Sequence, residues 1–125
     1  MRPSRYVAAW PRPGDLGVVA EADDGRPIGA CWLRFFTADD PGYGFVAADV
    51  PEVGMAVSAS WRGRGVGRAL LRGLVESARQ AGIQHLSLSV ERGNHALALY
   101  QAEGFAVVAA EDDALTLVKH VQSAP

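Results

Sequence analysis

Trp61-Arg62-Gly63-Arg64-Gly65-Val66-Gly67-Arg68 is the stretch that decides the fold. Before it, Val53 to Ser58 is predicted to be a strand. After it, apolar residues recur at helical spacing from about Gly65 to Ala81. Three alternate glycines let the backbone turn sharply and let a ligand approach its N–H groups closely. The stretch is therefore predicted to join a strand to a helix whose first N–H groups have no partner inside the helix.

The charges at this helix start are the reverse of those that a bare helix prefers. The macrodipole places about half a positive charge at the start of a helix, which favours Asp or Glu. Here Arg62, Arg64 and Arg68 stand instead, and no acidic residue follows before Glu76. A bound multivalent anion offsets this arrangement, because it accepts bonds from guanidinium and backbone N–H groups together. An Arg-rich solvated surface is the plainer interpretation, but glycines and arginines in this combination favour an anion site.

Two common nucleotide motifs do not fit the stretch. The P-loop pattern ends in Gly-Lys-Ser/Thr, and no such lysine is present here. A dinucleotide fingerprint that starts at Gly63 and Gly65 requires a third glycine at position 68, where the chain has Arg68. The anion is therefore expected to be bound in another way.

The rest of the chain alternates strands and helices. Further elements are predicted as strands at Gly17–Ala22, Ile28–Phe36 and Ile83–Val90, a helix at Asn94–Glu103, and a hairpin of Phe105–Ala109 with Leu115–Val121. The patch Tyr6–Trp10 is predicted to be the last turns of a helix, ended before Pro11. The helix between two strands makes those strands parallel neighbours. We expect one mixed α/β domain over residues 1–125, with a short segment 1–16 and a core 17–121.

Composition excludes several classes of protein. The 125 residues are 49% hydrophobic and 21% charged, values of an ordinary globular domain. A net charge of −2 gives no reason to expect nucleic acid as a partner. No apolar run reaches the roughly 20 residues of a membrane span. Cys31 is the only cysteine and is predicted to be a buried structural thiol. We expect a cytoplasmic protein.

Two motifs together resemble the GNAT N-acetyltransferase superfamily. Arg62-x-x-Gly65-x-Gly67 resembles the pyrophosphate-binding motif of that family. The run Asn94-His95-Ala96-Leu97-Ala98-Leu99-Tyr100, followed by Gly104-Phe105, is similar to its second signature. The resemblance extends over the element order from about Gly17 to Val121. It implies a GNAT-like fold, a central mixed, twisted sheet with helices on both faces.

The resemblance also implies a cofactor, acetyl-CoA. In the family the two parallel strands splay apart and the pantetheine arm bonds to backbone between them, which corresponds here to Met55, Ala56 and Val57. The loop after the strand would hold the pyrophosphate, and the cofactor-binding residues there are Arg62, Gly63, Arg64, Gly65, Val66, Gly67 and Arg68. Asn94 either contacts the pantetheine arm, as the family asparagine does, or caps its helix, or both.

The activity implied is acetyl transfer to a primary amine of a small molecule or peptide, by direct attack in a ternary complex. Tyr100 matches the family tyrosine that faces the CoA sulfur and is the candidate acid. Glu52 opens the strand about where many relatives carry a glutamate base, although a solvated carboxylate is an equal interpretation. Asp49 and Glu21 are held in reserve as bases. His85, His95 and His120 lack metal-ligand spacing, so no metal is expected.

The N-terminal part departs from the family. The usual first strand and two helices are expected to be largely absent, because only about 16 residues precede the first predicted strand. The strand Gly17–Ala22 would then be an exposed edge, which favours a homodimer. The same departure supports an alternative function, a catalytically inactive CoA-binding or sensory module of the same fold. Substituting Tyr100 by Phe separates the two, since only an enzyme has turnover to lose.

Overall fold

The computed structural model describes residues 2–6, 16–39, 42 and 44–122, with the backbone alone for residues 2–6. The chain forms two compact units. Unit 1 comprises residues 1–34 and 53–77, and unit 2 comprises residues 35–52 and 78–125. The expectation of a single domain stays a prediction. No helix in the described part of the chain is long and apolar enough to cross a membrane.

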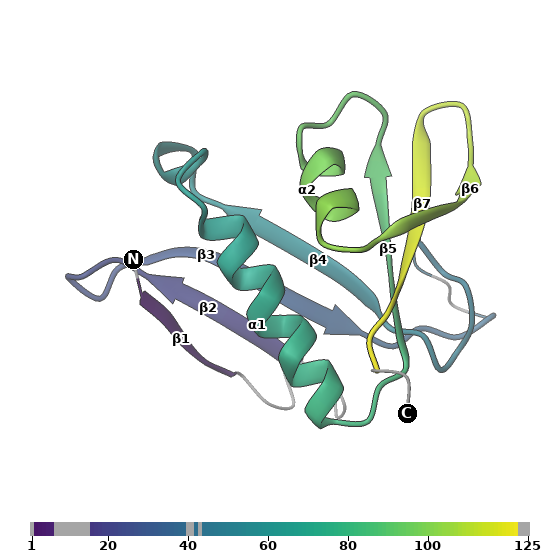
Figure 1. Cartoon of the computed structure of the whole chain (residues 1–125), viewed down its shortest axis with the longest axis horizontal. Coiled ribbons are helices and arrows are strands. Elements are labelled where there is room, and N and C mark those ends of the chain that lie inside the picture. Colours follow the sequence, from purple (N-terminus) through teal and green to yellow (C-terminus); the bar gives the residue numbers. More distant parts are fainter. Residues whose placement is uncertain (1, 7–15, 40–41, 43, 123–125) are drawn as a thin grey trace. The chain divides into compact units, whose positions relative to one another are not determined.

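Strands form most of unit 1 (Figure 1). Its strands are β1 (Arg2–Tyr6), β2 (Leu16–Glu21), β3 (Pro27–Arg34) and β4 (Glu52–Val57), of which Glu52 itself belongs to unit 2. β1, β2 and β3 pair antiparallel, and β4 is the next strand beside β3. The turn from β2 to β3 is closed by a bond from Gly25 N–H to Ala22 O, where Gly25 has a φ of 85°. This turn joins the two strands that were predicted at Gly17–Ala22 and Ile28–Phe36.

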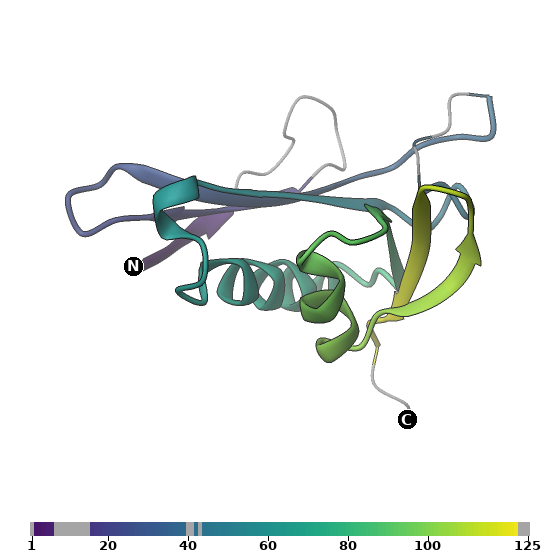
Figure 2. The same ribbon diagram turned by 90° about the horizontal axis from the view of Figure 1, so that it is seen from above.

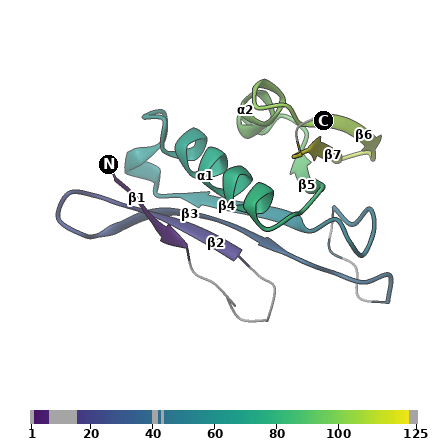
Figure 3. The same cartoon turned by 60° about the horizontal axis from the view of Figure 1, so that its bottom comes forward.

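The helix α1 (Val66–Gln80) covers one face of these strands, as Figures 2 and 3 show. Its apolar stripe is buried, with Val66, Leu70, Leu71 and Leu74 at 1% exposure or less. Gly29 of β3 lets the helix approach, because a Cβ there would lie 3.0 Å from Leu70 Cδ1. The helix ends as its sequence predicts. Gly82 has a φ of 79°, and its N–H bonds to Arg79 O.

The N-terminal strand was not expected from the sequence. Arg2–Tyr6 forms β1 and pairs antiparallel with β2, so the prediction that the first strand is absent is wrong. Tyr6, expected in a helix, ends this strand, and the remainder of that predicted helix lies outside the described residues. Arg2-Pro3-Ser4-Arg5-Tyr6 has no apolar alternation, and its strand exists because β2 offers a pairing edge. Pro3 is tolerated because β1 lies at the edge of the sheet.

A small group of strands and a short helix belong to unit 2 (Figure 1). β5 (His85–Glu91) and β6 (Ala106–Ala110) each pair antiparallel with β7 (Ala114–His120), in the order β5-β7-β6. Glu52, the first residue of β4, pairs parallel with Ser87 of β5, as the crossover predicts. Leu86, Leu88 and Leu117 form the core of this unit at 1% exposure or less.

The predicted elements otherwise agree with the observed ones to within one or two residues. One of the two-residue differences is in α2 (Ala96–Ala102), which was predicted to begin at Asn94. Asn94 Oδ1 accepts a 2.8 Å bond from Ala96 N–H, so this side chain stands before the first turn and satisfies one of its donors. The helix begins after the residue that was expected to open it.

Candidate functional site

The loop before α1 has the geometry that its glycines predict. A single turn of 3-10 helix, Ala59–Trp61, follows β4, and Arg62 is extended with φ −66° and ψ 147°. Gly63 and Gly65 have φ values of 76° and 83°, which other residues rarely adopt. A Cβ at either glycine would meet nothing within 4 Å, so the backbone angle, and not crowding, requires glycine there.

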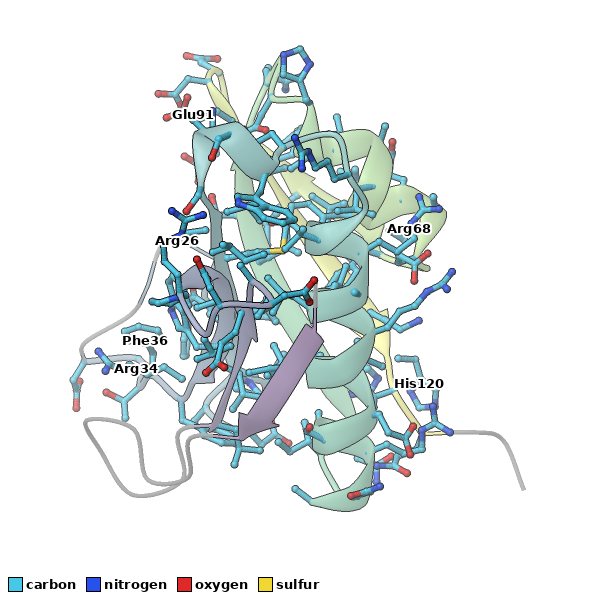
Figure 4. All side chains as sticks on the ribbon, turned by 90° about the vertical axis from the view of Figure 1, so that its left-hand side faces the viewer. Arg26, Arg34, Phe36, Arg68, Glu91 and His120 are labelled. Atoms are coloured by element: carbon cyan, nitrogen blue, oxygen red, sulfur yellow. The ribbon has the colours of Figure 1, made fainter. Side chains whose placement is uncertain are left out.

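The first turn of α1 has the donors and the charges of an anion site. A backbone bond from Ala69 N–H to Gly65 O stands at the start of the helix. The first N–H groups of an α-helix generally have no acceptor within the helix itself. The first turn contains no acidic residue. Arg62, Arg64 and Arg68 are exposed, and the Arg64 guanidinium lies 4.8 Å from the Trp61 ring centroid. In Figure 4, Arg68 and Arg26 lie at opposite sides of unit 1.

β4 presents backbone groups in two directions. Ser58 N–H donates a 2.8 Å bond to Ile28 O at the start of β3. Because the backbone groups of a strand alternate between its two edges, those of Ala56 also turn toward β3, whereas those of Met55 and Val57 turn away from it. The sequence predicted the same backbone role for Met55, Ala56 and Val57. In the structure only Met55 and Val57 direct their backbone groups away from β3.

Glu52 is held at the start of β4 by a backbone donor. Gly44 N–H donates a 2.7 Å hydrogen bond to Glu52 Oε1. Glu52 Oε2 is buried and has no hydrogen-bond partner. Burial raises the pKa of the Glu52 carboxyl above its ordinary value, and the Gly44 bond lowers it by a smaller amount. A general base works best when its pKa is near the operating pH. A raised pKa therefore brings the Glu52 carboxyl group closer to that range than the pKa of an exposed carboxyl group would be.

Two glycines shape the surroundings of this carboxylate. A Cβ on Gly42 would collide with Glu52 Oε2 and lie 2.6 Å from Cδ. A Cβ on Gly44 would lie 2.8 Å from the Leu88 carbonyl carbon and 2.9 Å from Ser89 N. The loop thus passes directly over β5 and places Gly44 N–H against Glu52. The sequence analysis did not predict that Gly42 and Gly44 surround Glu52. The one feature that could have indicated it was the spacing of these two glycines in a Pro/Gly/Asp-rich loop.

The other predicted residues of unit 2 lie on or before α2. Tyr100 is 8% exposed, and its ring meets Phe105 edge-on with centroids 5.9 Å apart. Asn94 caps its helix through Oδ1, so that half of its expected role is confirmed. Among the reserve bases, Asp49 is exposed, and Glu21 is the half-buried last residue of β2 in unit 1.

The described residues contain no group of three or more His, Cys, Asp or Glu side chains that is placed to hold a metal. Sequence reasoning missed one His pair. His85 and His120 are opposite each other on β5 and β7, with Nε2 and Nδ1 3.1 Å apart. Cys31 is fully buried in unit 1, as predicted, and burial raises its pKa to about 12.

A model of the Acetyltransferase (GNAT) family matches residues 1–105, which span both units. The ribosomal-protein-alanine N-acetyltransferase of Brucella melitensis is 30% identical, with a TM-score of 0.71, over 86% of this chain and 69% of that one. The chain belongs to the GNAT family. The resemblance inferred from Arg62-x-x-Gly65-x-Gly67 and the Asn94–Phe105 run is thereby confirmed.

Other relatives of this GNAT chain extend the comparison. The mycothiol acetyltransferase of Propionibacterium freudenreichii is 29% identical over 109 residues. The match covers 86% of this chain, which spans about a third (33%) of that relative's length. The PaiA N-acetyltransferase of Thermoplasma acidophilum, solved in complex with coenzyme A, shares the fold at 21% identity and a TM-score of 0.65. That match covers 86% of this GNAT chain and 60% of the other.

Proposed function

We propose that this chain transfers an acetyl group from acetyl-CoA to a primary amine of a small molecule or peptide, by direct attack in a ternary complex. The observation that carries the proposal is Glu52, whose carboxylate is fixed by Gly44 N–H at 2.7 Å and whose pKa is raised by burial. Membership of the GNAT family supports an acyl-CoA donor.

The start of α1 is the proposed site of the CoA pyrophosphate. Arg62, Arg64 and Arg68 supply charge there, while the backbone from Gly63 to Gly67 supplies the N–H donors at the start of the helix. Along β4, the outward backbone groups of Met55 and Val57 are the proposed partners of the pantetheine arm, with Ala56 between them. The likeness of the fold to a protein solved with coenzyme A is consistent with this assignment.

Glu52 and Tyr100 are the proposed acid–base pair. An alkyl amine with a pKa of about 10.4 is almost entirely protonated at neutral pH and must lose a proton before it attacks. In the proposed reaction Glu52 accepts that proton, the nitrogen lone pair forms a bond to the thioester carbon, and the C–S bond breaks. The sulfur leaves with the electron pair and takes the phenolic proton of Tyr100. The acetylated nitrogen then gives its second proton to the Tyr100 phenolate, so the products are a neutral amide and a free thiol, and the phenol is restored. Asn94 is a further proposed contact of the pantetheine arm.

The oligomeric state, the cellular location and the partners of the chain are also matters of proposal. β2 is not an uncovered edge, because β1 pairs with it, so the homodimer expected from that edge has lost its reason. A homodimer formed through another surface stays a prediction, tested by the mass in solution at micromolar concentration. A cytoplasmic location and the absence of nucleic-acid and membrane partners likewise stay predictions.

The test is release of free CoA from acetyl-CoA across a panel of primary amines, with Tyr100→Phe and Glu52→Gln beside the unchanged chain. We expect turnover with at least one amine, a loss of about a hundredfold in each variant, and unchanged acetyl-CoA affinity. Binding of acetyl-CoA without turnover, for any amine, would instead favour the inactive CoA-binding or sensory module.

A further inference from the structure

Two buried side-chain oxygens in the described part of the chain have no hydrogen-bond partner, Glu52 Oε2 and Ser87 Oγ. Ser87 is fully buried at 0% exposure. A buried polar oxygen that lacks a partner is costly, and in native proteins such atoms are few and commonly bind a water or serve the chemistry. Each of these two oxygens therefore has the capacity to form a further hydrogen bond.

These two residues are neighbours. Glu52 and Ser87 are register partners in the parallel pairing of β4 with β5, and the Ser87 N–H donates a 3.0 Å bond to Pro51 O. Residues in register on adjacent strands project to the same face of a sheet. The side chains of Glu52 and Ser87 therefore project side by side from the same face of the sheet. Both residues belong to unit 2.

The hydrogen bonds that the side chains of Glu52 and Ser87 can still form would suit one partner shared by both. Glu52 Oε1 is occupied by Gly44 N–H, so Oε2 is the open acceptor of the carboxylate. The Ser87 hydroxyl both donates and accepts, and its own backbone N–H is already used. One water molecule between the two residues would satisfy both oxygens, by donating to Oε2 and exchanging a bond with Oγ.

We propose that Ser87 Oγ and Glu52 Oε2 hold one water molecule between them, and that Ser87 positions this water to carry the proton of the acceptor amine to Glu52. The proposal rests on the proposed function and adds a positioning residue to it. The ammonium form of the acceptor gives one proton to the water, and the lone pair thus freed bonds to the thioester carbon. The water passes one of its own protons to Oε2, so it is regenerated and the carboxylate becomes a carboxylic acid.

A purely structural role for Ser87 makes different predictions. A small buried residue on β5 is replaced by alanine without harm, and removal of an unpaired hydroxyl even favours folding. A positioning role instead changes the titration of Glu52, because the bridging water stabilises the charged carboxylate by hydrogen bonding. The pKa of Glu52 is therefore the readout that separates the two roles.

The experiment compares Ser87→Ala with Ser89→Ala, a matched control from the same strand and the same face. The carboxyl carbon of Glu52 is followed by 13C NMR against pH in the full chain, and its signal is assigned by its loss in Glu52→Gln. We expect a higher Glu52 pKa in Ser87→Ala than in the unchanged chain, and no change in Ser89→Ala. Equal titration in all three proteins would overturn the proposal.

Turnover is the second readout. With an accepted amine, we expect Ser87→Ala to lower kcat by about tenfold while KM for acetyl-CoA is unchanged, and to move the acidic limb of the pH profile upward. Unchanged kcat in Ser87→Ala would also overturn the proposal. If the unchanged chain acetylates none of the amines, the proposed function fails, and the NMR titration still decides whether Ser87 and Glu52 are coupled.

Discussion

The Gly44 N–H group donates a 2.7 Å hydrogen bond to Glu52 Oε1, and a Cβ added to Gly44 would meet the backbone of Leu88 and Ser89. One glycine therefore performs two tasks. It brings the loop down onto β5, and it aims a backbone donor at a carboxyl group whose pKa is raised by burial.

Substituting Gly44 by Ala should displace this donor. The new Cβ would lie 2.8 Å from the Leu88 carbonyl carbon, a contact with backbone that cannot move aside cheaply. We expect lower stability, a rise in the pKa of Glu52 because a bond to the charged form is lost, and reduced turnover. Thermal unfolding and the pH profile of kcat/KM check this, and a variant with unaltered Tm and profile would contradict it.

Substituting Glu52 by Gln should stabilise the fold in a pH-dependent way. The pKa of Glu52 is higher in the folded than in the unfolded chain, so the folded state holds the proton more tightly. Stability is then lost as pH rises through the folded pKa. Glutamine cannot ionise and escapes this loss.

We therefore expect a higher Tm for Glu52→Gln than for the unchanged chain near pH 7.5. The difference should vanish below the ordinary glutamate pKa of about 4.3. Thermal unfolding of both proteins across this range is the measurement. A Tm difference that is independent of pH would show that ionisation of Glu52 has no part in it.

The arginines at the start of α1 should set the affinity for CoA. Substituting Arg62 or Arg64 by Ala removes a charge that we propose contacts the pyrophosphate, and a hydrogen bond to a charged group contributes about 1.5–3 kcal/mol. We expect the Kd of acetyl-CoA, measured by calorimetry, to rise about tenfold or more.

Arg26→Ala is the matched control for these variants. Arg26 is exposed, lies in unit 1 in the turn after β2, and is separated from the start of α1 (Figure 4). Its loss changes the net charge equally and should leave the Kd unchanged. An equal weakening in all three variants would mean that overall charge, and not a site at the helix start, governs binding.

Substituting Gly73 by Ala should stabilise the chain. Gly73 lies inside α1, and a Cβ there would lie 3.5 Å from Val18 Cγ1, an ordinary van der Waals distance. Alanine is favoured over glycine in a helix interior by about 1 kcal/mol, so Tm should rise by a few degrees. A lower Tm would show that α1 and β2 are closer together than described.

The Cys31 thiol should be inert in the folded chain. It is fully buried and its pKa is raised to about 12, so the reactive thiolate is scarce at neutral pH. We expect a thiol reagent to label Cys31 only at the rate of unfolding, with full labelling in denaturant. Rapid labelling of the folded chain at pH 7.5 would contradict the burial of this residue.

The sequence predicted what is local. Val66, Leu70 and Leu74 recur at helical spacing, Gly82 ends the helix with a positive φ, and the strand pattern from Ile83 placed β5 to within two residues. The start of α1 was likewise recognisable, because three glycines and three arginines stand within eight consecutive residues.

What depends on distant residues was not predictable. β1 lacks a strand pattern and forms only because β2 pairs with it. Glu52 was expected to open β4, but its enclosure by Gly42 and Gly44 depends on a loop that returns to β5. The contact of His85 with His120 joins residues 35 positions apart, and only the register of two strands brings them together.

The most direct test of the account is thermal unfolding with acetyl-CoA, with free CoA and ATP as controls. A ligand at 100 times its Kd adds about 2.7 kcal/mol of stability, a shift of several degrees for a chain of this size. We predict a rise in Tm with acetyl-CoA and with CoA but not with ATP. No rise with any of the three would contradict a CoA site at the start of α1.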